Sequence, residues 1–162
     1  MFYARFYFKF AALVFATLHG PLVLAQSDSL AKQIDRGRYL VLIGHCNNCH
    51  TAGYAPSGGK VPEERWLTGN PVGWRGKNGT TYAHNLRLYV KDLTEDGWLQ
   101  LVKNVQSRAP MPSWSLRATT DDDLKAMFHY IRSLKPLGEP APLFLPPDKD
   151  PPRPFNLLPD MS

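Results

Sequence analysis

The sequence is poor in cysteine, in long apolar segments and in charge of one sign. Its 162 residues include only two cysteines, Cys46 and Cys49, which provide no disulfide framework of the kind that stabilises small secreted domains. After residue 25 no apolar run approaches the ~20 residues that span a bilayer. The formal net charge is +5, without a basic cluster interleaved with aromatic residues, so nucleic-acid binding is not indicated. Internal repeats and strand-like alternation are also lacking.

The N-terminal segment has the pattern of a secretory signal peptide, residues 1–25. Arg5 and Lys9 precede an apolar run over residues 10–18, and small residues allow cleavage after Ala25. Cleavage removes both basic residues and leaves a net charge of +3. We expect an exported protein; an uncleaved signal anchor is the alternative.

Cys46, Cys49 and His50 form a C-x-x-C-H motif, the pattern of c-type haem attachment. Two thiols separated by two residues in a short helix reach the two vinyl groups at one edge of a porphyrin. The adjacent imidazole of His50 then approaches the iron from the same side. The motif predicts one covalently bound haem c with His50 as the proximal ligand.

Three other roles are open to a cysteine pair with this spacing. A thiol–disulfide oxidoreductase requires a thioredoxin-like βαβ context, which the sequence does not indicate. A zinc site needs four ligands, and neither a second C-x-x-C nor a paired histidine cluster is present. A structural disulfide is the remaining alternative, and the export signal together with a suitable methionine argues against it.

The predicted sixth ligand of the iron is Met111. It lies between Pro110 and Pro112, which preclude an ordinary helix and favour a rigid loop that presents the thioether. Ligation by histidine and methionine raises the haem reduction potential, as suits an electron carrier. His84, in a loop, is the second candidate, Met127 fits the apolar face of a helix, and His129 is expected to be solvated. His45 and Met161 are the other candidates.

The rest of the chain predicts one all-α domain over residues 35–135, after a flexible lead-in at 26–34. We expect a helix from Asp35 to about Cys49, irregular chain over 51–90 that packs on the haem, and two further helices. Thr94 is the expected N-cap of one of these and Thr120 that of the other, with Asp123 completing a capping box; the last helix ends at Lys135-Pro136.

The tail, residues 136–162, contains nine prolines. It is predicted to run extended rather than to form a packed unit. Phe144 and Phe155 are possible anchors on the domain surface, and a free linker is the alternative.

This order of features resembles the class I cytochrome c fold: helix, C-x-x-C-H, irregular loops, helix, Pro-Met-Pro and a final helix. The stretch Gly37-Arg38-Tyr39-Leu40, followed by the haem motif, is similar to the cytochrome c subunits of bacterial periplasmic alcohol and gluconate dehydrogenases. Those subunits carry several haems, so this chain resembles a single haem domain of that type.

The resemblance implies that the first and last helices cross, with Gly37 and the Tyr39/Leu40 pair near Tyr130 and Ile131. It also implies that a proline carbonyl accepts a hydrogen bond from the proximal imidazole. Pro62 has the expected offset from His50, and Pro56 is the alternative. Candidate donors to the haem propionates in the loop region are Trp74, Arg75, Tyr82, Asn85 and Arg87.

Three functions fit these features. The first is a periplasmic electron carrier, not an enzyme, that takes electrons from a dehydrogenase or quinol oxidoreductase and passes them to an oxidase or another cytochrome. The second is a haem enzyme or gas sensor with a displaceable distal ligand, for which His84 would be the acid–base group. The third is the haem subunit of a dehydrogenase complex, docked through its proline-rich tail.

Overall fold

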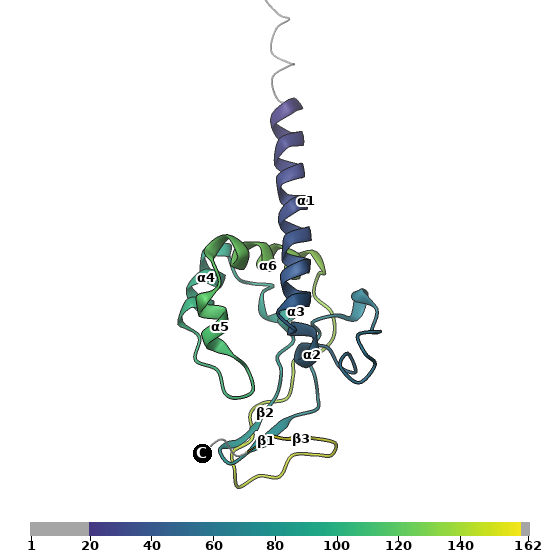
Figure 1. The fold of residues 1–162 in the computed structure, drawn as a ribbon, viewed down its shortest axis with the longest axis vertical. Helices are drawn as coiled ribbons and strands as arrows, with labels where there is room; N and C mark the ends of the chain where they lie inside the picture. Colours follow the sequence, from purple (N-terminus) through teal and green to yellow (C-terminus); the bar gives the residue numbers. More distant parts are fainter. Residues whose placement is uncertain (1–19, 160–162) are drawn as a thin grey trace, which may run out of the picture.

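The structure, a computed structural model, describes residues 20–159. Most of its regular structure is helical, in agreement with the predicted all-α class, and one small sheet lies at the end opposite the start of the first helix (Figure 1). Residues 1–19 of the predicted signal peptide, and Met161, lie outside the described residues. The elements are α1 (Gly20–Ile43), α2 (Cys46–His50), η1 (Glu63–Arg65), β1 (Trp74–Gly76), β2 (Gly79–Thr81), α3 (Leu86–Tyr89), α4 (Glu95–Asn104), α5 (Ser113–Ala118), α6 (Asp121–Ser133) and β3 (Asn156–Leu157).

Helix α1 differs at both ends from the predicted helix. The expected flexible lead-in at residues 26–34 is helical, because helix-forming residues such as Ala31 and Lys32 extend a helix whose later turns are held by tertiary packing. The N-terminal half of α1 stands away from the rest of the molecule (Figure 1). Within residues 20–159, no helix is long and apolar enough to cross a membrane.

The predicted continuous helix to Cys49 is interrupted just before the haem motif. The N–H of Gly44 donates to the Leu40 carbonyl at 2.8 Å, and His45 adopts a left-handed conformation with φ of 55°. This conformation ends α1 and lets α2 start in a new direction. The cysteine motif therefore sits on its own short helix.

The crossing of α1 and α6 forms the centre of the fold. Gly37 makes it possible, because a Cβ at this position would lie 2.0 Å from the Ala126 carbonyl oxygen and 2.7 Å from the Cβ of Tyr130. The resemblance thus placed Gly37 correctly, and Leu40 also packs against the core. It placed Tyr39 wrongly: this side chain is 51% exposed and lies beneath the Arg36 guanidinium.

Both predicted N-caps are confirmed. The Thr94 hydroxyl accepts the N–H of Gly97 at 3.1 Å, and the Thr120 hydroxyl accepts that of Asp123 at 3.2 Å. The carboxylate of Asp123 binds Arg36 of α1, with atoms 2.8 and 3.2 Å apart, so the side chain that was expected to complete a capping box links two helices. Helix α5 was not predicted; it begins directly after Pro112.

The loop region expected to be irregular contains a β-hairpin that binds the tail. Strands β1 and β2 are antiparallel, and β3 pairs with β1 in parallel. Earlier in the tail, Leu145 pairs with Thr80 of β2. The tail is thus extended and anchored on the hairpin. Phe155 is half-buried and stacks with Arg153 of the tail itself.

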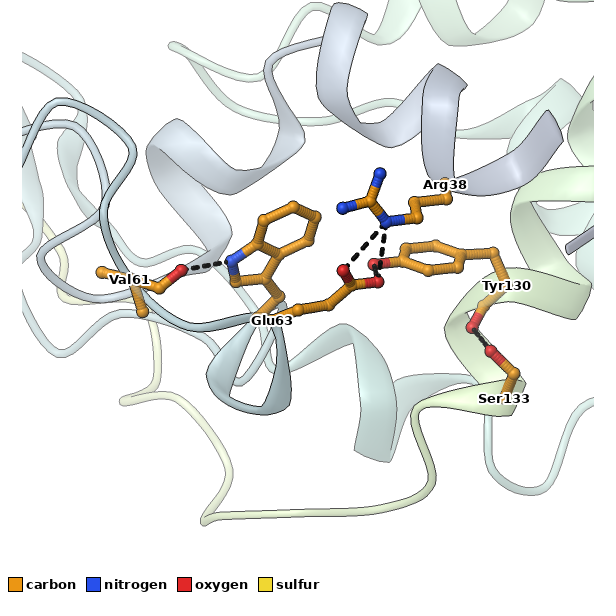
Figure 2. Close-up of polar contacts among 6 residues, drawn as sticks. Arg38, Val61, Glu63, Tyr130 and Ser133 are labelled. Carbon is orange, nitrogen blue, oxygen red and sulfur yellow. Dashed lines mark hydrogen bonds and ion pairs between the residues drawn. The ribbon is translucent and has the colours of Figure 1, made fainter. Parts of the chain in front are cut away.

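A polar network ties η1 to the helix crossing. Figure 2 shows Glu63 between Arg38 of α1 and Tyr130 of α6. Arg38 Nε donates to both carboxylate oxygens of Glu63, at 3.0 and 2.9 Å, and the Tyr130 hydroxyl donates to one of them at 2.8 Å. Burial and the adjacent Glu63 carboxylate raise the pKa of Tyr130. The chain that follows the haem motif is therefore held against both central helices.

Candidate functional site

The two cysteines lie one turn apart on α2, partly buried and not bridged to each other. Burial raises the pKa of the Cys46 thiol to about 11 and raises the pKa of Cys49 as well. Thiol–disulfide oxidoreductases require the opposite shift, because the thiolate is the reactive form. The environment of this pair thus disfavours the oxidoreductase alternative.

His50 is buried and its ring orientation is held by a backbone oxygen. Nδ1 lies 2.7 Å from the carbonyl oxygen of His84, so Nδ1 carries the proton and Nε2 keeps its lone pair. Burial, the largest influence, lowers the pKa of His50 despite the opposing effect of this hydrogen bond. The imidazole is therefore neutral at neutral pH, which metal ligation requires.

The predicted acceptor for His50 was wrong. Pro62 is exposed, and its carbonyl accepts the N–H of Arg65 at the start of η1; the alternative, Pro56, is not the partner either. The carbonyl of His84 takes this role because Gly69 lets the two segments approach. Gly69 has φ of 86°, and a Cβ there would lie 2.9 Å from the Asn85 nitrogen. The N–H of Gly69 in turn donates to the His50 carbonyl at 2.8 Å.

The rest of α2 is fastened to the core by polar contacts. The Thr51 hydroxyl donates to the Asn47 side chain at 2.7 Å and accepts the N–H of Leu67 at 2.8 Å. Asn47, Thr51 and Leu67 are each at most 1% exposed. These contacts hold the end of the helix that carries His50.

Met111 is half-buried in the loop between α4 and α5. Its N–H donates to the Arg108 carbonyl at 3.1 Å, and its own carbonyl accepts from the Ser107 hydroxyl at 3.0 Å. This loop lies at the lower ends of α4 and α5, toward the three-stranded sheet (Figure 1). The backbone thus forms a defined turn that presents the Met111 side chain.

Most of the other ligand candidates have structural roles or point to solvent. Met127 lies in the hydrophobic core, as predicted. His129 was expected to be solvated, but its Nε2 lies 2.8 Å from Glu95. The side chains of His45 and His84 are exposed, and the His84 ring lies against Tyr89.

Three of the five candidate propionate donors are used by the scaffold. The Arg87 guanidinium donates to the carbonyls of Glu64, Leu134 and Lys135, and burial lowers its pKa. The Asn85 side chain caps α3 and donates to the carbonyls of Leu137 and Glu139. Arg75 binds the carbonyls of Pro147 and Lys149, and the Asp150 carboxylate. These three side chains are hydrogen-bond donors, as predicted, but backbone oxygens occupy them.

Trp74 and Tyr82 remain as donors. Within the part of the chain that the structure describes, neither the indole N–H of Trp74 nor the Tyr82 hydroxyl has a hydrogen-bond partner. Over the same residues, no group of three or more His, Cys, Asp or Glu side chains could hold a metal ion by itself. The donor set fits haem well: two unbridged thiols one turn apart, a neutral imidazole with Nε2 available, a methionine on a fixed turn and two unpartnered N–H or O–H groups.

Fold and site together define a helical domain suited to a covalently attached haem. The family model described as "Cytochrome c" matches residues 34–135. No curated protein and no solved structure matches the chain. The chain belongs to the cytochrome c family; it is a haem-based electron-transfer protein that binds haem c covalently and exchanges electrons with redox protein partners.

Proposed function

We propose that this protein is a single-haem electron carrier of the bacterial periplasm with histidine–methionine ligation. Cys46 and Cys49 form the thioethers, His50 is the proximal ligand and Met111 the distal one. The observation that carries the proposal is the buried, neutral imidazole of His50, whose Nδ1 is fixed on the His84 carbonyl at 2.7 Å. This bond orients Nε2 and raises its basicity toward a metal.

Haem supplies the one-electron exchange between Fe(II) and Fe(III). The protein's residues keep the surroundings of the iron unchanged during that exchange: His50 is held by the core, and Met111 by a hydrogen-bonded turn between two prolines. Trp74 and Tyr82 are the proposed donors to the propionates, since their polar atoms are otherwise unpaired within residues 20–159. Electron donors are a periplasmic dehydrogenase or quinol oxidoreductase, and acceptors an oxidase or another cytochrome.

The test uses the holoprotein expressed with a c-type maturation system. We expect a mass increase of one haem, a ferric far-red band of the kind that methionine–iron ligation produces, and no rapid CO binding by the ferrous form. Met111→Ala should retain the haem, lose the band and bind CO, because the sixth position is then open. Met127→Ala is the matched control and should keep the band. Rapid CO binding by the unaltered protein would instead support a haem enzyme or gas sensor.

Periplasmic location is tested separately. Fractionation of bacteria that express the full chain should release the protein with the periplasmic contents, shortened by cleavage after Ala25. Retention in the membrane fraction with an intact N-terminus would indicate the uncleaved anchor instead.

A further inference from the structure

The tail beyond Lys135 lies outside the residues that the cytochrome c family model matches, yet it is fastened to the domain at several points. Leu145 and Thr80 exchange two backbone hydrogen bonds, of 2.7 and 3.0 Å. Farther along, the N–H of Asn156 donates to the Gly73 carbonyl at 2.8 Å, and Arg75 binds the Lys149 carbonyl at 2.6 Å. These contacts fix the tail on the β1–β2 hairpin.

Phe144 extends this attachment to a second segment. A Cβ on Gly79, whose φ is 115°, would lie 2.6 Å from the Phe144 ring and 2.3 Å from the Leu145 oxygen, so the tail fits closely over this glycine. The Arg108 guanidinium carbon lies 4.0 Å from the centre of the same ring, a cation–π contact. Phe144 therefore connects the hairpin to the loop between α4 and α5.

Arg108 is part of the turn that presents Met111. Its carbonyl accepts the N–H of Met111 at 3.1 Å. Pro110 and Pro112 have no N–H to offer, and the Ser107 hydroxyl bond to the Met111 carbonyl is local to the same loop. The contact with Phe144 is thus a tie from this turn to a segment remote in sequence.

We propose that Phe144 and Arg108 are positioning residues for Met111. Their contact attaches the turn that presents the distal ligand to the tail. The proposal rests on Met111 being the sixth ligand. For an external ligand to reach the iron, the Met111 turn must move away, and this open state is rarer when Arg108 is held by Phe144. An added ligand binds only that minor state, so its apparent affinity measures how strongly the Phe144–Arg108 contact disfavours opening of the turn.

The test measures imidazole binding to the ferric holoprotein, together with the far-red methionine band. Phe144→Ala should increase the affinity for imidazole about five- to thirtyfold, the range that loss of a partly desolvated cation–π contact supports, and should weaken the band. Phe144→Tyr keeps an aromatic face and should behave as the original protein. Leu143→Ala is the matched control, since this neighbouring side chain is 85% exposed, and should change neither readout.

A second variant separates positioning from general stability. Arg108→Gln should reproduce the effect of Phe144→Ala, and the double variant should show little further change, because both substitutions remove one interaction. Unchanged imidazole binding in both single variants, or additive effects in the double variant, would overturn the positioning role of Phe144 and Arg108. Failure of the proposed function gives a different result: the far-red band would be absent before any substitution, and Met111→Ala would leave the spectrum unaltered, which overturns both proposals.

Discussion

The two sides of the proposed haem site are held in different ways. His50 is 7% exposed, lies on a helix fastened to the core, and has its ring fixed at 2.7 Å from a backbone oxygen. Met111 is half-buried in the loop between α4 and α5; its own backbone hydrogen bonds are those of a local turn, and Arg108 of that turn contacts the tail. The proximal side is therefore built into the helical domain that the family model matches, whereas the distal side depends partly on the tail beyond that domain. Local opening follows the weaker contacts, so perturbations should reach the distal side first.

The largest effect is expected from removing the proximal ligand. His50→Ala should reduce the yield of stable holoprotein at least about tenfold, since even residues that only hydrogen-bond to a metal ligand account for effects of about 10- to 100-fold. Haem content per polypeptide, measured by absorbance after purification, checks this.

His84→Ala is the matched control for that substitution. It keeps the backbone carbonyl that accepts from His50 and removes only an exposed ring, so haem content should stay normal. Loss of haem in this variant, with retention in His50→Ala, would exchange the roles assigned to the two histidines.

The next largest effect is expected at the crossing of α1 and α6. Gly37→Ala places a methyl group 2.0 Å from the Ala126 carbonyl oxygen, so α1 and α6 must separate. Overpacking of this kind costs about 1–3 kcal/mol. Denaturant unfolding of the holoprotein should show the loss. Gly97→Ala is the matched control in a helix: a Cβ there would meet only side-chain atoms, the Thr94 hydroxyl at 3.2 Å and a Leu93 methyl group at 3.9 Å, and the variant should be close to neutral. Equal losses in both variants would contradict the role of Gly37.

A smaller effect, with a pH signature, is expected at Tyr130. Its folded-state pKa is raised, so the hydroxyl contributes its full stability below the pKa of an unfolded tyrosine, about 10, and loses that contribution as pH rises further. Tyr130→Phe should lower the free energy of unfolding by about 1 kcal/mol at neutral pH, and the difference should shrink above about pH 10.

Urea unfolding at several pH values measures that difference. Tyr39→Phe, in a side chain that is 51% exposed, should leave the curve unchanged. A difference between Tyr130→Phe and the original protein that stays constant above this pH would contradict the proposed network with Glu63.

The smallest effect is expected at Asp123. The hydrogen bond from Arg36 lowers the pKa of this carboxyl group, so its contribution is present above the ordinary value of about 4 and disappears as pH falls through the lower folded-state value. Asp123→Asn should lower the melting temperature at neutral pH and not at strongly acidic pH, where the carboxyl group is protonated. The effect at neutral pH should be small, because the ion pair is exposed. Asp122→Asn removes a charge from the same helical turn; if it causes an equal loss, the ion pair with Arg36 contributes nothing.

Features encoded by neighbouring residues could be predicted from the sequence. The caps at Thr94 and Thr120 need only a hydroxyl next to a free backbone N–H, and the motif of α2 is local as well. The acceptor of His50 could not be found, because it is a backbone oxygen 34 positions away and any residue type can supply one. The partners of Arg87 and Asn85 could not be predicted for the same reason. Their side chains are recognisable as donors, and only the folded chain shows that backbone carbonyls occupy them.

The sheet was missed for a related reason. Strand β1 has three residues and completes its pairing with β3, which lies in the proline-rich tail. Such short strands have no periodicity of their own and form because a distant partner is held against them. The helical lead-in was missed because its stability comes from the part of α1 that crosses α6.

The most direct test of the account is the proton NMR spectrum of the ferrous holoprotein. A methionine that ligates haem iron has its methyl protons shifted far upfield by the ring current of the porphyrin. We predict one such resonance, present in the unaltered protein and in Met127→Ala and absent in Met111→Ala. An unaltered protein without this resonance, or a Met111→Ala variant that keeps it, would contradict the proposed six-coordinate electron carrier with Met111 as its distal ligand.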